Sequence, residues 1–237
     1  MRFMRRASLT GSFAAAAFAA FVAIASMTGV AHAQGGVKPK TAEDDVERLS
    51  RAGDGRAIGP DSAKVTLIEF LDYACPTCRA FHLAKADSLR RMVGPDVRIA
   101  YFTFLITDHL RAFHGAEAAL CGGFVGGSAG YLKMADAIFS NQDEWKDALD
   151  PSPLFDRYAK GAGLDAAAYA ECRARDAVAP MIVSDLYTAD KFEVQGTPTF
   201  VVMPRGATGL DQTFRTSGNV PVKDILDLVA QARAKAK

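Results

Sequence analysis

Residues 65–82 read VTLIEFLDYACPTCRAFH, in which a strand-forming run passes directly into a helix-forming one. Val65–Leu71 is rich in β-branched and large apolar residues, which is typical of a buried strand. Pro76 is favoured at the first position of a helix, and Gly94-Pro95 stops one. The stretch therefore predicts a strand followed by a helix from Pro76 to about Met92.

Strand and helix signals further along the chain complete an α/β pattern. Val97–Phe104 predicts a second strand, and Thr199–Met203 and Gln212–Thr216 predict two more before a helix from Pro221 to about Lys235. Residues 111–190 are Ala-rich and helix-forming. Breaks in this helical block are expected at Gly122-Gly123, Gly126-Gly127, Pro151, Pro153, Gly161 and Gly163. We therefore expect one α/β domain with an inserted all-helical subdomain.

The first 33 residues have the composition of an export signal. Arg2, Arg5 and Arg6 precede thirteen uninterrupted apolar residues, and the small-x-small triplet Ala31-His32-Ala33 follows. Thirteen apolar residues fall short of the roughly 20 that span a bilayer. We therefore expect cleavage before Gln34, with an uncleaved anchor as the alternative.

The composition is that of an ordinary globular protein. The chain is 49% apolar and 23% charged, with 28 Lys+Arg against 27 Asp+Glu, which excludes collagen-like and disordered classes and gives no reason to expect a nucleic-acid partner. All four cysteines follow the signal, as suits an oxidising compartment. The organisation that we expect is a signal peptide over 1–33, a leader with a short helix at Thr41–Arg51 over 34–58, an α/β domain over 59–110 and 191–237, and a helical insertion over 111–190.

Cys75-Pro76-Thr77-Cys78 carries the clearest chemistry in the chain. Proline at the first helical position makes Cys75 the N-cap residue, so that unpaired backbone N–H groups and the positive end of the helix dipole face its sulfur. Cysteines at helix starts or in C-x-x-C motifs have pKa values lowered to about 3.5–7.5. A stabilised thiolate makes the corresponding disulfide more oxidising.

The phase of the predicted helix distinguishes the two cysteines. With Phe81, Leu89 and Met92 as the buried stripe, Cys78 falls inside its edge and Cys75 lies further round, toward solvent. We therefore assign Cys75 as the attacking sulfur and Cys78 as the buried resolving sulfur.

Two further candidates lie outside the motif. Glu69 stands six residues before Cys75 in an otherwise apolar strand, where burial would raise its pKa and suit it to proton exchange with Cys78; an exposed strand face is the alternative. Thr197-Pro198 precedes a predicted strand, and a cis bond there would let the backbone beside the sulfur pair with a bound peptide like an added strand. A simple turn is the alternative.

Residues 65–82, the distant Gly196-Thr197-Pro198-Thr199 segment and the helical block between them resemble the DsbA family of periplasmic thiol-disulfide oxidoreductases. The resemblance covers about residues 58–237. It implies a thioredoxin fold with a helical insertion, a Cys75–Cys78 disulfide donated to reduced, unfolded exported proteins, a cis Pro198, and reoxidation by a DsbB-like quinone-linked membrane oxidase. Thr77 stands where the best-known oxidases have His, a residue that can donate to the thiolate.

Cys121 and Cys172 lie on segments predicted to be helical, and some DsbA-like proteins resemble this chain in having a second cysteine pair there. A bond between them would close a loop of about 50 residues and contribute roughly 4 kcal/mol. A second redox centre and two free thiols are the alternatives.

The leading hypothesis is a periplasmic disulfide oxidase that requires no cofactor, with an isomerase or reductase as the runner-up. A metal-binding or chaperone module is a second class, because C-x-x-C is also a zinc ligand pair. Cys121 and Cys172 lack the spacing of a second ligand pair, so we expect no metal. The hydrolase-like Gly126–Gly130 and the dinucleotide-like Gly161–Ala166 are declined, since neither follows a predicted strand.

Overall fold

The computed structural model describes residues 55–207 and 209–236. The expected signal over residues 1–33 and the leader helix expected over residues 41–51 lie outside these ranges. Among the described residues, no helix combines the length and the apolar character needed to cross a bilayer.

A five-stranded mixed sheet forms the centre of the described fold, in the strand order β1-β3-β2-β4-β5. β2 and β3 are parallel, and the other neighbouring pairs are antiparallel. The strands are β1 (Ala57–Ile58), β2 (Val65–Leu71), β3 (Val97–Thr103), β4 (Thr199–Pro204) and β5 (Phe214–Ser217). The four strands expected from the sequence are confirmed with small differences at their ends, whereas the short edge strand β1 was not predicted.

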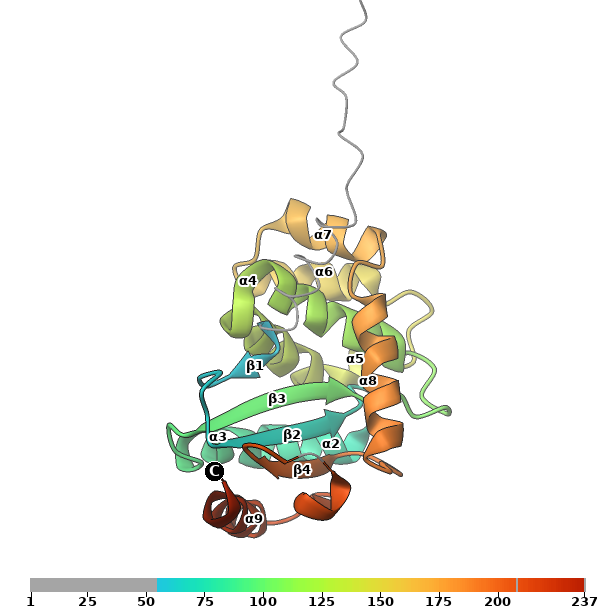
Figure 1. Ribbon diagram of the computed structural model, residues 1–237. Helices are drawn as coiled ribbons and strands as arrows, with labels where there is room; N and C mark the ends of the chain where they lie inside the picture. The colour runs from blue at the N-terminus through green and yellow to red at the C-terminus, as the bar shows by residue number, and fades with distance from the viewer. Residues whose placement is uncertain (1–54, 208, 237) are drawn as a thin grey trace, which may run out of the picture. The chain divides into compact units, whose positions relative to one another are not determined.

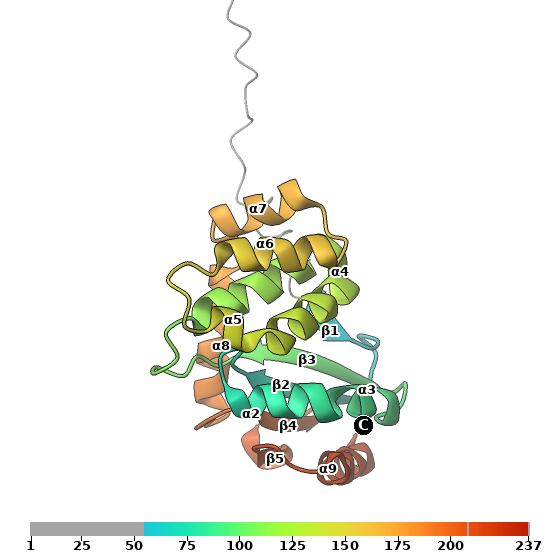
Figure 2. The same ribbon diagram turned by 180° about the vertical axis from the view of Figure 1, so that it is seen from behind.

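Helices cover both faces of the sheet. On one face, α2 (Pro76–Phe81), η1 (His82–Ala86) and α3 (Asp87–Met92) form one continuous run, which Figure 2 shows in front of the strands. α8 (Ala179–Lys191) crosses the opposite face, as Figure 1 shows. α9 (Val222–Lys235) packs against β4 and β5. This arrangement buries the apolar side chains of both sheet faces.

The helix that follows the cysteine motif contains one π-helical turn, η1. A π-turn takes more residues than an α-turn, so the residues that follow it are rotated around the helix axis and different positions face the core. Phe81 and Leu89 are buried as expected, but Met92 is 60% exposed and Val93, at 3%, is buried instead. The prediction for Met92 is therefore wrong, because the widened turn shifts the helical phase.

Between β3 and β4 the chain forms a helical block, and Figures 1 and 2 show most of it stacked beside the β1–β3 edge of the sheet. Its helices are α4 (Ala112–Ser140), α5 (Gln142–Trp145), α6 (Ser152–Gly161), α7 (Ala166–Ala174) and α8. The expected α/β fold with an all-helical insertion is confirmed.

The two glycine pairs of α4 behave differently. Gly127 adopts a φ of 61° and kinks the helix, so the expected break there is confirmed. The break expected at Gly122-Gly123 is wrong, since the helix continues through it. A Cβ atom at Gly122 would lie 2.5 Å from Cγ of Met134, so this glycine serves close packing within the bent helix.

Candidate active site

Cys75 lies at the junction of strand and helix. It is the N-cap residue of α2, and Pro76 occupies the first turn, as the sequence predicts. Both cysteines of the motif are free thiols, with Cys75 7% exposed and Cys78 fully buried. Cys75 is more exposed than Cys78, as expected, although its position on the helix predicted a side chain turned further toward solvent. Cys75 is thus the sulfur more open to attack.

The surroundings of the two sulfurs move their pKa values in opposite directions. The pKa of Cys75 is lowered to about 5, chiefly by a hydrogen bond with the Cys78 thiol. Burial opposes this effect, while Thr197 and then the backbone of Cys78 and Thr77 add to it. Burial raises the pKa of Cys78 well above its ordinary value. The helix start therefore contributes, but the neighbouring thiol is the larger influence, which the sequence argument did not include.

The Thr197-Pro198 bond is cis and brings the Thr197 backbone beside the reactive sulfur. Cys75 Sγ lies 3.6 Å from the Thr197 carbonyl oxygen, to which the thiol donates. Two segments 122 residues apart in sequence therefore meet at the same site.

Glu69 lies on β2 and is only 4% exposed, so the alternative of an exposed strand face is wrong. Burial raises its pKa to about 8, and the nearby Arg90 cation opposes the rise. Burial is the main cause that raises the pKa values of Tyr73, Tyr101 and Tyr131, and the charge of Glu69 adds to it. The structure therefore places this carboxyl near three buried tyrosines.

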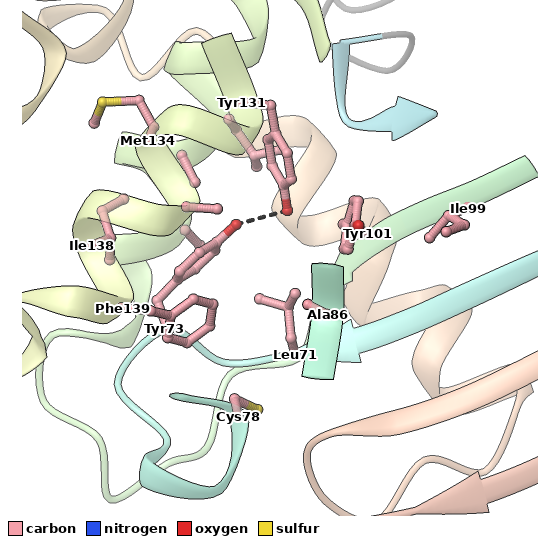
Figure 3. Close-up of a cluster of buried hydrophobic side chains, with 14 of the residues drawn as sticks. Leu71, Tyr73, Cys78, Ala86, Ile99, Tyr101, Tyr131, Met134, Ile138 and Phe139 are labelled. Carbon is pink, nitrogen blue, oxygen red and sulfur yellow. Dashed lines mark hydrogen bonds between the residues drawn. The ribbon is translucent and has the colours of Figure 1, made fainter. Parts of the chain in front are cut away.

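Tyr73 anchors the turn before Cys75 in the helical block. Its hydroxyl and that of Tyr131 on α4 are joined by a buried hydrogen bond of 2.7 Å, which Figure 3 shows as a dashed line. Its ring also stacks on Phe139, with centroids 4.9 Å apart. Gly115 permits this approach, since a Cβ atom there would lie 2.8 Å from the Cβ atom of Tyr73.

Asp72, which was not predicted from the sequence, also holds the turn before Cys75. Its fully buried carboxylate accepts hydrogen bonds from the backbone N–H groups of Ala74, at 2.7 Å, and Ile106, at 2.9 Å. Nδ1 of His109 lies 2.8 Å from the same carboxylate. An acid within an apolar stretch was the available signal, but the sequence could not show which loop would supply its partners.

Gln142 on α5 was also missed. It is 1% exposed, and its Nε2 donates to the carbonyl oxygens of Tyr73, at 2.7 Å, and Cys75, at 3.1 Å. Nothing in the local sequence distinguishes it from a surface glutamine, because its partners lie 67 and 69 residues earlier.

The second cysteine pair lies away from this site. A disulfide joins Cys121 on α4 to Cys172 on α7, so the alternative of two free thiols does not hold. Both residues are buried, at 0% and 2% exposure. In the described part of the chain, no group of three or more His, Cys, Asp or Glu side chains is arranged to hold a metal ion.

A family model described as Thioredoxin matches residues 51–209. The chain belongs to the thioredoxin family. Among curated proteins, it is 34% identical over 148 residues to the Na(+)/H(+) antiporter NhaA 3 of Salinispora tropica, a match that covers 62% of this chain and 21% of that protein. The chain thus spans about a fifth of the length of the curated relatives that it matches.

Solved structures share the thioredoxin fold with its helical insertion. DsbA2 of Pseudomonas aeruginosa is 22% identical, with a TM-score of 0.59 over 75% of this chain and 93% of that one. α-DsbA1 of Wolbachia pipientis is 20% identical, with a TM-score of 0.63 over 76% and 93%. A thioredoxin-like oxidoreductase of Silicibacter pomeroyi is 26% identical, with a TM-score of 0.55 over 80% and 99%. The resemblance to DsbA proteins is therefore confirmed for the fold.

Proposed function

We propose that this protein is a thiol-disulfide oxidoreductase that introduces disulfide bonds into exported proteins through Cys75 and Cys78. The observation that carries the proposal is the position of Cys75 at the start of α2, next to the buried Cys78 and 3.6 Å from the Thr197 carbonyl oxygen. In this setting the pKa of Cys75 is lowered to about 5, chiefly by a hydrogen bond with the Cys78 thiol. A stabilised thiolate favours the reduced state of the pair, so the disulfide form is a good oxidant. The solved structures of similar fold that are named DsbA or oxidoreductase support this activity.

The proposed reaction exchanges one disulfide for another. A substrate thiolate attacks Cys75 of the oxidised site, and the Cys78 sulfur leaves with the electron pair of the broken bond and takes up a proton. A second substrate thiolate then attacks the substrate sulfur of the mixed disulfide and releases Cys75 as a thiolate. The substrate loses two electrons and two protons. The protein takes up both electrons and one proton, which leaves a Cys78 thiol and a Cys75 thiolate, and the other proton passes to solvent.

Two other residues have proposed roles in this exchange. Glu69, a buried carboxyl whose pKa is raised to about 8, would exchange the proton of Cys78. The backbone of Thr197 and Pro198, beside Cys75, would pair with the substrate peptide as an added strand.

The setting is proposed to be the periplasm. The predicted signal over residues 1–33 supports export, and reduced, unfolded exported proteins would be the substrates. Reoxidation of the dithiol would fall to a DsbB-like quinone-linked membrane oxidase. No residue of the site calls for a bound cofactor, since the sulfurs carry the electrons.

A paired assay tests the direction of exchange. The oxidised protein is mixed with a reduced, unfolded model protein, and in parallel the reduced protein is mixed with a scrambled one. Rapid oxidation of the first substrate is expected. Activity on the scrambled substrate alone would refute the oxidase proposal in favour of an isomerase. The feature that motivates this alternative is Thr77, which stands where the best-known oxidases have His. Inactivity on both, with stoichiometric metal in the purified reduced protein, would refute both enzymes in favour of the metal-binding alternative.

A further inference from the structure

The backbone around Cys75 is held by a side chain from the helical block. Gln142 begins α5, and its amide nitrogen has two hydrogens, enough for both of the carbonyl groups to which it donates. These carbonyl groups belong to Tyr73 and Cys75, so they flank Ala74 on either side. One buried amide therefore holds two peptide units, 73–74 and 75–76, at the entrance to the motif.

The Cys75 carbonyl has a second partner that belongs to α2. It accepts the N–H of Arg79 at 3.1 Å, which is the first hydrogen bond of the helix that Cys75 caps. Gln142 and the first turn of α2 thus hold the same oxygen atom. Because this carbonyl belongs to Cys75 itself, its direction is tied through the backbone to the position of the Cys75 side chain at the start of α2.

We propose that Gln142 is a positioning residue for Cys75, which keeps its sulfur over the start of α2 and thereby makes the helical block part of the reactive site. The proposal deepens the proposed function, on which its meaning for catalysis rests. The Gln142 amide donates to two backbone carbonyl groups, and the proposed action on the Cys75 sulfur passes through them.

An amide is suited to this position because the groups that it faces accept hydrogen bonds and do not donate them. A carboxylate there would face two carbonyl oxygens without a hydrogen to offer, and an apolar side chain would leave both oxygens without this partner. The elements around Gln142 are fixed independently. The Trp145 indole donates to the Ile138 carbonyl at 2.8 Å, and Arg79 pairs with Asp143 at 2.7 Å.

The test replaces Gln142 by methionine, which has a similar length and no donor. Gln231→Met is the matched control, since Gln231 is exposed on α9. In the reduced proteins, ultraviolet thiolate absorbance is followed against pH, and alkylation of Cys75 is timed at pH 5. We expect Gln142→Met to raise the titration midpoint of Cys75 by about one pH unit. At pH 5 this lowers the fraction of Cys75 that is thiolate about fivefold, so alkylation should slow by the same factor. The control should match the wild type.

Circular dichroism and the fluorescence of Trp145, the single tryptophan, report whether each variant is folded. A folded Gln142→Met with the wild-type midpoint and rate would overturn the proposal. If that variant does not fold, Gln142→Asn, which keeps the amide but shortens its reach, should shift the midpoint in the same direction. If neither folds, the side-chain amide resonances of Gln142 in the wild type should move as Cys75 titrates, and unresponsive resonances would overturn the proposal.

These readouts need no protein substrate. A wild-type protein that oxidises no substrate would therefore refute the proposed function and leave the assignment of Gln142 to be judged by the titration.

Discussion

The two cysteine pairs of this chain are similarly buried, yet they stand in different chemical states. Cys75 and Cys78 are free thiols at the start of α2, whereas Cys121 and Cys172 are joined in a disulfide between α4 and α7. Burial does not separate them, because Cys75 is 7% exposed and Cys172 is 2% exposed.

The position of each sulfur along its helix does separate the two pairs. Cys75 caps a helix start, where N–H groups without intrahelical partners stabilise an anion. Cys121 lies within α4, where the N–H groups are used by the helix, and Cys172 lies in the last turn of α7, where the dipole disfavours an anion. A similar degree of burial is therefore compatible with either chemical state. What distinguishes Cys75 is its place at a helix start beside a second thiol, both of which favour its thiolate.

The largest expected effect comes from removing the proposed attacking sulfur. Cys75→Ser should lower the rate of substrate oxidation by a factor on the order of 10³ or more, since the disulfide with Cys78 that is to be exchanged can no longer form. The double variant Cys121→Ser/Cys172→Ser is the matched control and should keep most of the activity. Similar losses of oxidation rate in both variants would contradict the assignment of Cys75 and Cys78 as the reactive pair and of Cys121 and Cys172 as a structural one.

The second expected effect concerns stability. The residues Cys121 and Cys172 are 51 positions apart, and a bridge over a loop of this length contributes roughly 4 kcal/mol in the chain-entropy account. Replacing both by alanine should lower Tm by about 8–16 °C in calorimetry of a protein of this size. Cys75→Ala/Cys78→Ala serves as the control. An equal loss of stability in the two double variants would contradict a purely structural role for the second pair.

The third expected effect concerns Glu69, whose pKa is raised from 4.5 to about 8 by burial. The folded protein holds this proton where the unfolded chain has lost it, so the free energy of unfolding should fall as pH rises from about 4.5 to about 8. Glu69→Gln removes that decline, which is on the order of a few kcal/mol. Urea unfolding at several pH values measures it, with the exposed Glu171→Gln as control. Parallel pH curves for wild type and Glu69→Gln would show that Glu69 is charged in the fold.

The sequence predicted the parts of the site whose signals are local. Val65–Leu71 and the helix beginning at Pro76 follow from apolar runs and a proline at a helix start, and the N-cap position of Cys75 follows from both. The prediction of which helical residues are buried was wrong only after η1, at Met92, because a π-turn has no clear signal in the composition of the sequence.

The remaining parts depend on tertiary contacts. Asp72 and Gln142 acquire their roles from partners 34 and 67 residues away, and an isolated Asp or Gln looks the same in a loop or on a surface. The hydrogen bond between the two thiols was missed for a different reason. The helix start is visible in the sequence and accounts for part of the lowered pKa of Cys75, but the sulfur three residues later is the larger influence, and its hydrogen bond depends on side-chain orientation.

The most direct test of a thiolate held at the start of α2 is the pH titration of thiolate absorbance in the reduced wild-type protein, with Cys75→Ser as the blank. One thiolate should form with a midpoint near pH 5 and be missing from the blank, while Cys78 should stay protonated until well above its ordinary range. A Cys75 midpoint near 9, the ordinary thiol value, would contradict the account.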